Sequence, residues 1–123
     1  MSNQALVSQI NDAIGAHGMW KLRLRTSVQT GKSDITPEVA GCDDACTFGK
    51  WLKHSPIEPA VKSGVPYQVV SRLHADFHRA AGNVLADALT GRPKEAEATL
   101  QGEFTERSEK LVKALTKWKR ELI

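Results

Sequence analysis

Three long stretches of the sequence repeat inward-facing residues in alternating steps of three and four. An α-helix turns once in about 3.6 residues, so this spacing puts the repeated side chains of each stretch on one face. The stretches run from Asn3 to about Thr30, from about Val65 to Leu89 and from about Pro93 to Leu122. Their faces are formed by Leu6, Ile10, Ala13, His17, Trp20, Leu24 and Val28; by Val70, Leu73, Phe77, Ala81 and Val84; and by Leu100, Phe104, Ser108, Leu111, Leu115, Trp118 and Leu122. The pattern therefore predicts an all-α fold.

The segments between these helices predict how they are joined. Residues 31–41 are interpreted as a connection, because glycine at the start and proline within it break a helix. A short helix is expected at 45–54, capped by Asp43 or Asp44 and closed by Pro56. Three long helices and one short, cysteine-bearing helix predict an antiparallel, up-and-down bundle that resembles a four-helix bundle.

The size of the chain and the odd number of long helices bear on its assembly. A length of 123 residues fits one domain, and residues 1–123 are interpreted as a single unit. One side of the bundle must be closed by the short helix, by the 31–41 connection or by a second copy of the chain. We therefore expect a homodimer, although the sequence does not reveal its geometry.

Composition narrows the class of protein. No apolar run reaches the roughly 18 residues of a membrane span, and the start is too polar for a signal peptide. We therefore expect a cytoplasmic protein without membrane insertion. The formal net charge is only +3, and basic and aromatic residues do not alternate as they do in single-strand binders. No nucleic-acid partner is predicted.

Three histidines fall on the inner faces of the predicted helices. His74 and His78 lie four residues apart, so both point to the same side of their helix, and His17 occupies a position of the first inner face. A buried imidazole nitrogen without a partner costs about 1–3 kcal/mol. Either hydrogen bonds within the core or a shared metal ion would remove this cost, and the histidines alone leave both readings open.

Cys46 supplies a fourth candidate at the start of the short helix. The free N–H groups there are expected to lower the pKa of the thiol and favour the thiolate, whereas the alternative is a small buried apolar residue. Three nitrogens and one sulfur suit Zn²⁺ better than Mg²⁺ or Ca²⁺, which prefer oxygen. His17, Cys46, His74 and His78 are thus the predicted zinc ligands.

Three sequence runs resemble a known family. They are His17-x-x-Trp20-Lys21, Cys46-x-x-Gly49-Lys50-Trp51-Leu52, and Leu73-x3-Phe77-His78 with His74 inside. In this order they resemble the bacterial chemoreceptor zinc-binding (CZB) domain over nearly the whole chain. The resemblance implies a helical bundle that holds one zinc ion through His17, Cys46, His74 and His78.

The same resemblance implies a role in signal transduction, including chemotaxis. Members of the family are similar to sensory modules attached to chemoreceptors or to cyclic-di-GMP-making enzymes. This sequence ends at Ile123, without a methyl-accepting hairpin or a cyclase. We interpret it as a stand-alone member that works through such a partner, or else as an excised piece.

The leading hypothesis is a zinc-binding sensory or regulatory module. Loss of zinc would leave a thiol and three imidazoles free to protonate and repel, which would loosen the bundle. The change would pass across a dimer or to a partner protein.

Other functions are kept open beside this one. An oxidant such as hypochlorous acid could act on the thiolate of Cys46, with Cys42 either resolving the product or having no role. The zinc could also be purely structural in an interaction module. An enzyme is not predicted, because four protein ligands leave no open position for water, and Ala75 stands where a His-Glu-x-x-His protease needs glutamate.

Overall fold

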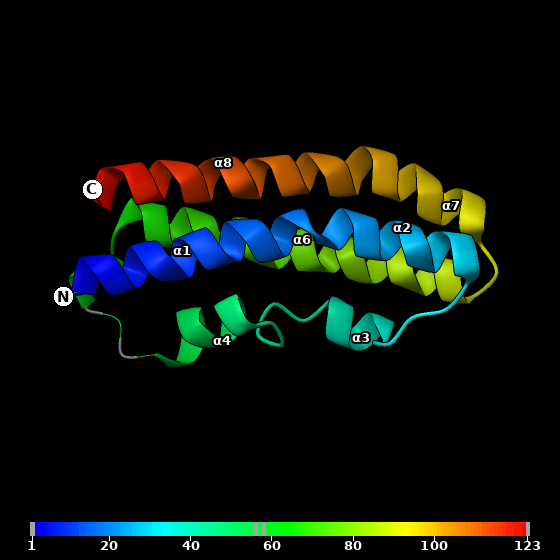
Figure 1. The fold of residues 1–123 in the computed structure, drawn as a ribbon, viewed down its shortest axis with the longest axis horizontal. Helices are drawn as coiled ribbons and strands as arrows, with labels where there is room; N and C mark the ends of the chain where they lie inside the picture. Colours follow the sequence, from blue (N-terminus) through cyan, green and yellow to red (C-terminus); the bar gives the residue numbers. More distant parts are fainter. Residues whose placement is uncertain (1, 56, 58, 123) are drawn as a thin grey trace.

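The computed structural model describes residues 2–55, 57 and 59–122, and three long helical rods lie side by side along its longest axis (Figure 1). The first rod consists of α1 (Ser2–Gly18) and α2 (Trp20–Thr30), and the second is α6 (Val65–Leu89). The third consists of α7 (Pro93–Thr99), the π-helical turn η1 (Leu100–Phe104) and α8 (Thr105–Leu122). The described residues contain no strand. The predicted all-α bundle is confirmed.

The segment between the first two rods returns along one side of the bundle (Figure 1). It carries α3 (Pro37–Ala40), α4 (Thr47–His54) and α5 (Pro59–Lys62). The path of the chain is therefore up and down, with an irregular second member in place of a fourth long helix. Here α3 packs on α6 and α4 packs on α1. The side left open by three long helices is thus covered by the short helix and the connection of the same chain.

The predicted inner faces form the core. Ile10, Phe77, Phe104 and Leu111 are completely buried, and every rod contributes to the same cluster of apolar side chains. Full burial of such a side chain stabilises the fold by about 1.5–3 kcal/mol. Within the described ranges no helix combines the length and the apolar character needed to cross a membrane.

The first predicted long helix is broken, which corrects the expectation of one helix from Asn3 to Thr30. The α1 helix ends at Gly18, and Met19 separates it from α2. Glycine lowers helix stability by about 1 kcal/mol relative to alanine, which favours a break at this place. The two helices continue along one line in Figure 1. The predicted end of this segment is confirmed, because Gly31 has a left-handed φ of 70° and donates its N–H to Ser27 O at 2.8 Å.

The start of the short helix also differs from the prediction. Cys46 is the N-cap of α4, and its Sγ accepts a hydrogen bond from the Gly49 N–H at 3.3 Å. The expectation that Asp43 or Asp44 caps this helix is wrong, because the helix begins only at Thr47. The closing role expected of Pro56 lies outside the described residues.

The connection at 31–41 contains a helical turn that the sequence pattern does not reveal. Thr36 caps α3 by accepting a hydrogen bond from the Val39 N–H at 3.2 Å, and Pro37 occupies the first turn. Proline suits that position because its fixed φ matches a helix and its missing N–H would have no partner there. This one turn places the backbone of Ala40 against α6.

Candidate metal centre

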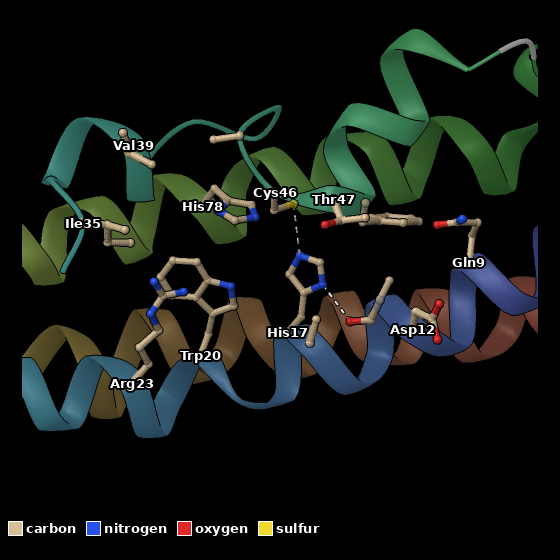
Figure 2. Close-up of a pocket in the computed structure, with 14 residues that line it drawn as sticks. Gln9, Asp12, His17, Trp20, Arg23, Ile35, Val39, Cys46, Thr47 and His78 are labelled. Carbon is tan, nitrogen blue, oxygen red and sulfur yellow. Dashed lines mark hydrogen bonds between the residues drawn. The ribbon is translucent and has the colours of Figure 1, made fainter. Parts of the chain in front are cut away.

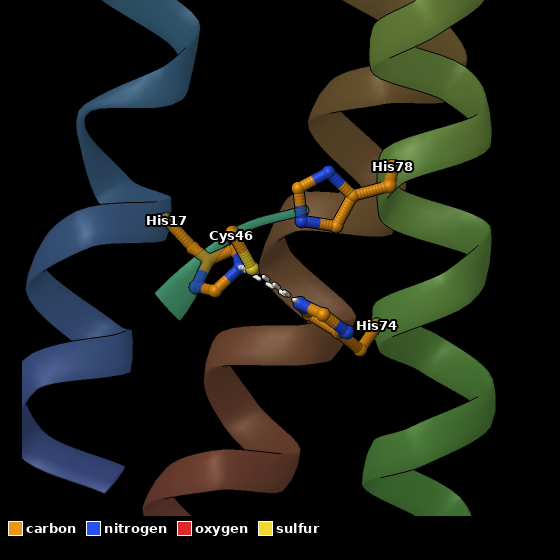
Figure 3. Close-up of side chains that lie close together, drawn as sticks. All are labelled: His17, Cys46, His74 and His78. Carbon is orange, nitrogen blue, oxygen red and sulfur yellow. Dashed lines mark hydrogen bonds between the residues drawn. The ribbon is translucent and has the colours of Figure 1, made fainter. Parts of the chain in front are cut away.

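The four predicted ligands come together between α1, α6 and the start of α4 (Figure 3). His17 lies in the last turn of α1, His74 and His78 lie one turn apart on α6, and Cys46 immediately precedes α4. Each offers one donor atom, and these atoms all lie within 4.8 Å of one another. The three histidines are each 1% exposed. Donors from three separated parts of the chain thus form one buried cluster.

The spacing of the donors suits a tetrahedral ion. Cys46 Sγ lies 3.3 Å from His74 Nε2 and 3.9 Å from His17 Nε2, and the two Nε2 atoms are 3.1 Å apart. Bonds of about 2.0–2.3 Å around tetrahedral Zn²⁺ separate its donors by about 3.3–3.6 Å. The observed distances fall on both sides of that range, so shifts of a few tenths of an ångström would bring these three donors to it.

Backbone carbonyls orient two of the imidazoles. His17 Nδ1 lies 2.7 Å from Ala13 O, and His78 Nδ1 lies 3.0 Å from Ala40 O. A carbonyl can only accept, so we assign the proton of each ring to Nδ1. This tautomer leaves the Nε2 lone pair of each ring free for a metal. Carbonyl oxygens thus have, at His17 and His78, the orienting role that a carboxylate often has beside a metal-bound histidine.

His78 Nε2 is a buried atom that no other described atom satisfies by a hydrogen bond. With the Nδ1 proton given to Ala40 O, this nitrogen is an acceptor without a donor. An unsatisfied buried polar group costs about 1–3 kcal/mol, and native proteins seldom carry one without a reason. Coordination of a metal ion would remove this cost, so the residues present fit Zn²⁺.

The imidazoles are held neutral. Burial lowers the pKa of His17 to about 4, against a weaker opposing effect of its bond to Ala13 O. Burial, together with the nearby His78 and His17, lowers the pKa of His74 to about 2, and burial also lowers the pKa of His78. The expectation that metal-free imidazoles protonate and repel is therefore wrong near neutral pH. Neutral imidazole is the form that binds metal.

The thiol behaves differently from the prediction. Burial raises the pKa of Cys46 above its ordinary value, and this outweighs the lowering by the N–H groups at the start of α4. The expected low thiol pKa is therefore wrong for the metal-free chain. The sequence pattern located the N–H groups correctly but could not show how deeply the surrounding segments bury the sulfur.

The loop before α4 explains the glycine of the Cys-x-x-Gly run. A Cβ at Gly49 would overlap the carbonyl oxygen of Asp43, so only glycine fits while its N–H reaches Cys46 Sγ. Lys53 Nζ lies 2.7 Å from a carboxylate oxygen of Asp43 and ties the loop to α4. Tyr67 donates its hydroxyl proton to Leu52 O at 2.8 Å, which holds α4 on α6. These contacts fix where the thiol lies.

Aromatic rings surround the histidines and limit access of water. Phe77 meets His17 edge-on at 5.0 Å between ring centres, Trp20 meets His78 at 5.6 Å, and Phe48 meets His74 at 5.3 Å. Trp20 is therefore one of the rings around the cluster. Trp51 instead stacks on Phe48. Phe48 itself was not singled out by the sequence reasoning, although it lies within the Cys-x-x-Gly-Lys-Trp-Leu run.

A cavity of about 490 Å³ connects the cluster with the surface. His17, Cys46 and His78 line it together with the exposed residues Asp12 and Arg23. Figure 2 shows the three donors turned toward one another, with Trp20 beside them. Cys46 is half-buried and lines this cavity, so the cavity is the side from which a small molecule or ion would approach it.

One cysteine and one histidine of the chain lie outside the cluster. Cys42 is an exposed free thiol, and His54 is exposed at the end of α4. Sequence reasoning missed the carbonyl groups of Ala13 and Ala40. For Ala13 the helical spacing of four residues to His17 was a usable signal, whereas Ala40 reaches His78 only through the tertiary fold.

Comparison with known proteins agrees with this geometry. The family model described as the chemoreceptor zinc-binding domain matches residues 17–85, which contain all four clustered residues. No curated protein and no solved structure matches the chain. The matched segment begins at His17 and spans more than half of the sequence. The chain therefore belongs to the chemoreceptor zinc-binding (CZB) domain family.

Proposed function

We propose that the chain is a sensory or regulatory module that holds one Zn²⁺ through His17, Cys46, His74 and His78. Membership of a zinc-binding family and the buried cluster of four donors support zinc binding. The single observation that carries the assignment is His78 Nε2, a buried acceptor that lacks a hydrogen-bond partner among the described atoms. A role of this nitrogen as the fourth zinc ligand would account for its missing partner.

The residues of the chain prepare the site before any ion arrives. The imidazoles stay neutral because burial lowers their pKa values. The two carbonyl contacts direct Nε2 of His17 and His78 inward. A bound Zn²⁺ supplies the positive charge that stabilises the thiolate of Cys46, so binding releases the thiol proton. Affinity for zinc should therefore rise with pH.

The proposed signal is a change in how residues 31–55 lie on the long helices. Cys46 is the donor contributed by this segment, and the other three belong to α1 and α6. Loss of the ion would remove a link between the segment and the rods. A signalling protein, such as a chemoreceptor or a cyclic-di-GMP enzyme, or a second copy of the chain would respond to the altered surface.

Hydrogen exchange with and without a zinc chelator tests this proposal. We expect amides at 42–54 to exchange faster without zinc, while those of Phe77, Leu111 and Leu115 in the core stay protected. A loss of protection throughout the chain would instead identify a purely structural zinc. Equal exchange in both states would contradict a role of zinc occupancy in signalling. Cys42→Ser, which alters an exposed thiol outside the cluster, is the matched control.

Oxidant sensing is the second candidate, and the cavity that reaches Cys46 favours it. A two-electron oxidant such as hypochlorous acid would convert the thiolate to a sulfenic acid and would itself be reduced to chloride. The oxidised sulfur is a weaker zinc ligand. Release of zinc to a coloured chelator in step with modification of Cys46, measured by mass spectrometry, would support this input over zinc concentration.

A catalytic role is not part of the proposal. Catalytic zinc sites keep a position open for water or substrate, whereas four protein donors complete a tetrahedral shell. The homodimer likewise stays a prediction, and its original basis is weakened because α3 and α4 already cover the open side of the bundle.

A further inference from the structure

The short helix α3 lies on α6 through two glycines. Gly82 is buried in α6, and a Cβ at this residue would lie 2.9 Å from Gly41 Cα, 3.0 Å from Pro37 O and 3.1 Å from Gly41 N. These neighbours are all backbone atoms, which cannot turn away as a side chain can. Only glycine at this position therefore permits the observed approach of α3 to α6.

This approach determines whether a candidate ligand is correctly oriented. Gly82 lies four residues after His78, so both occupy the same face of α6. Gly41 directly follows Ala40, whose carbonyl oxygen lies 3.0 Å from His78 Nδ1. The contact between Gly82 and Gly41 therefore lies next to the hydrogen bond between His78 and Ala40. The two residues on α6 are one helical turn apart, and the two residues on the connection are adjacent. A shift of α3 away from α6 would lengthen that hydrogen bond.

The geometry points to Gly82 and Gly41 as positioning residues of the metal site, although neither offers a donor atom. Their contact sets the distance between α3 and α6, which lets Ala40 O fix the His78 ring with Nε2 toward Cys46, His17 and His74. This inference rests on the proposed zinc binding. It assigns to a backbone contact the role that a carboxylate often has beside a metal-bound histidine, where loss of the partner typically weakens metal binding by about 10–100-fold.

The test compares zinc affinity in Gly82→Ala, Gly41→Ala and Gly102→Ala. Gly102 is the matched control, because it is exposed and a Cβ there would meet no atom within 4 Å. We expect Gly82→Ala to bind zinc about 10–100-fold more weakly in a chelator competition. Gly41→Ala should lose less, because its Cβ would meet Pro37 O at 3.2 Å and Gly82 Cα only at 3.8 Å. The control should match the unmodified chain.

A second readout separates positioning from general loosening. Long-range ¹H–¹⁵N spectra of the zinc-loaded proteins report the protonation and metal binding of each imidazole nitrogen. In the unmodified chain His78 should carry its proton on Nδ1, and in Gly82→Ala this signal should change while those of His17 and His74 keep their metal-bound pattern. A change that is equal for all three histidines would overturn the inference.

The remaining outcomes are also decisive. If Gly82→Ala does not fold, the milder Gly41→Ala carries the test, and an unchanged His78 spectrum together with zinc affinity within about twofold of the unmodified chain would contradict the positioning role. The same result for a folded Gly82→Ala, with an unchanged His78 spectrum, would do so directly. If the unmodified chain itself binds no zinc, the proposed function fails first, and the two failures are thus distinguishable.

Discussion

His17 Nε2 lies 3.1 Å from His74 Nε2, although the two residues are 57 positions apart in the sequence and each is 1% exposed. Two buried acceptor nitrogens at this distance repel unless a proton or a cation lies between them. In the metal-free chain one of them must carry a proton to form the hydrogen bond. In the zinc-loaded chain both lone pairs would point to the ion instead. The protonation of these two nitrogens should therefore differ between the zinc-free and the zinc-loaded chain.

Replacement of His78 by alanine should abolish stoichiometric zinc. The variant removes one of four donors together with its bond to Ala40 O, and a three-donor site is open to water. Elemental analysis of the purified protein, after dialysis against a weak chelator, measures the effect. His54→Ala is the matched control, since this histidine is exposed and outside the cluster. Full zinc content in His78→Ala would show that His78 is not a ligand.

Stability of the metal-free chain should fall as the pH is lowered through the range below 6.5. The folded pKa of His17 is about 4, against 6.5 when unfolded, so between these values the unfolded state binds more protons than the folded state. The stabilisation is complete above pH 6.5 and is lost as the pH falls toward 4. His17 alone should cost about 2 kcal/mol between about pH 7.5 and about pH 5.

Urea unfolding of the chelator-treated protein at these two pH values checks the direction in which the free energy of unfolding changes with pH. His74 and His78 act in the same direction, because burial lowers their pKa values as well. A metal-free chain that is equally stable at both pH values, or more stable at the lower one, would contradict the neutral, buried state of these imidazoles.

Gly49→Ala should weaken zinc binding by displacing Cys46. The new Cβ would overlap Asp43 O, so the loop must move and carry the sulfur away from its Gly49 N–H donor. We expect a loss of about tenfold or more in a chelator competition. Gly15→Ala is the control, because a Cβ at Gly15 has open space and alanine should stabilise α1 by about 1 kcal/mol. Equal affinity of both variants would show that the loop tolerates the side chain.

Mild oxidation should modify Cys42 and Cys46 at different rates when zinc has been removed. Cys42 is exposed and should react whether or not zinc is present, whereas Cys46 is half-buried and its metal-free pKa is raised. Because the thiolate is the reactive form, Cys46 in the chelator-treated chain should react more slowly than Cys42. Peptide mass spectrometry after a short exposure gives both rates. Faster modification of metal-free Cys46 would contradict the raised pKa.

Much of this fold follows from helical periodicity. Ile10, Phe77 and Leu111 are buried because they occupy the inner faces that the spacing predicts, and His17, His74 and His78 turn inward for the same reason. The three histidines and the cysteine then predict zinc as the metal, without knowledge of any distance between them. The pattern predicts correctly on which face of a helix a side chain lies, because that face depends only on local helical geometry.

The rest depends on contacts between segments that are distant in the sequence. The raised pKa of Cys46 results from burial by neighbouring segments, and the partner of His78 is a carbonyl in a helical turn that has no periodicity of its own. The break at Met19 and the π turn at Leu100–Phe104 are small local departures from a repeat that otherwise continues. None of these could be read from the spacing of apolar residues.

X-ray absorption at the zinc edge of the native, zinc-loaded chain tests the central claim most directly, because it counts the donor types around the ion. We predict one sulfur at about 2.3 Å and three imidazole nitrogens at about 2.0–2.1 Å, with the sulfur lost in Cys46→Ser. A shell of oxygen and nitrogen without sulfur, or the same shell in both proteins, would show that His17, Cys46, His74 and His78 do not bind one ion together.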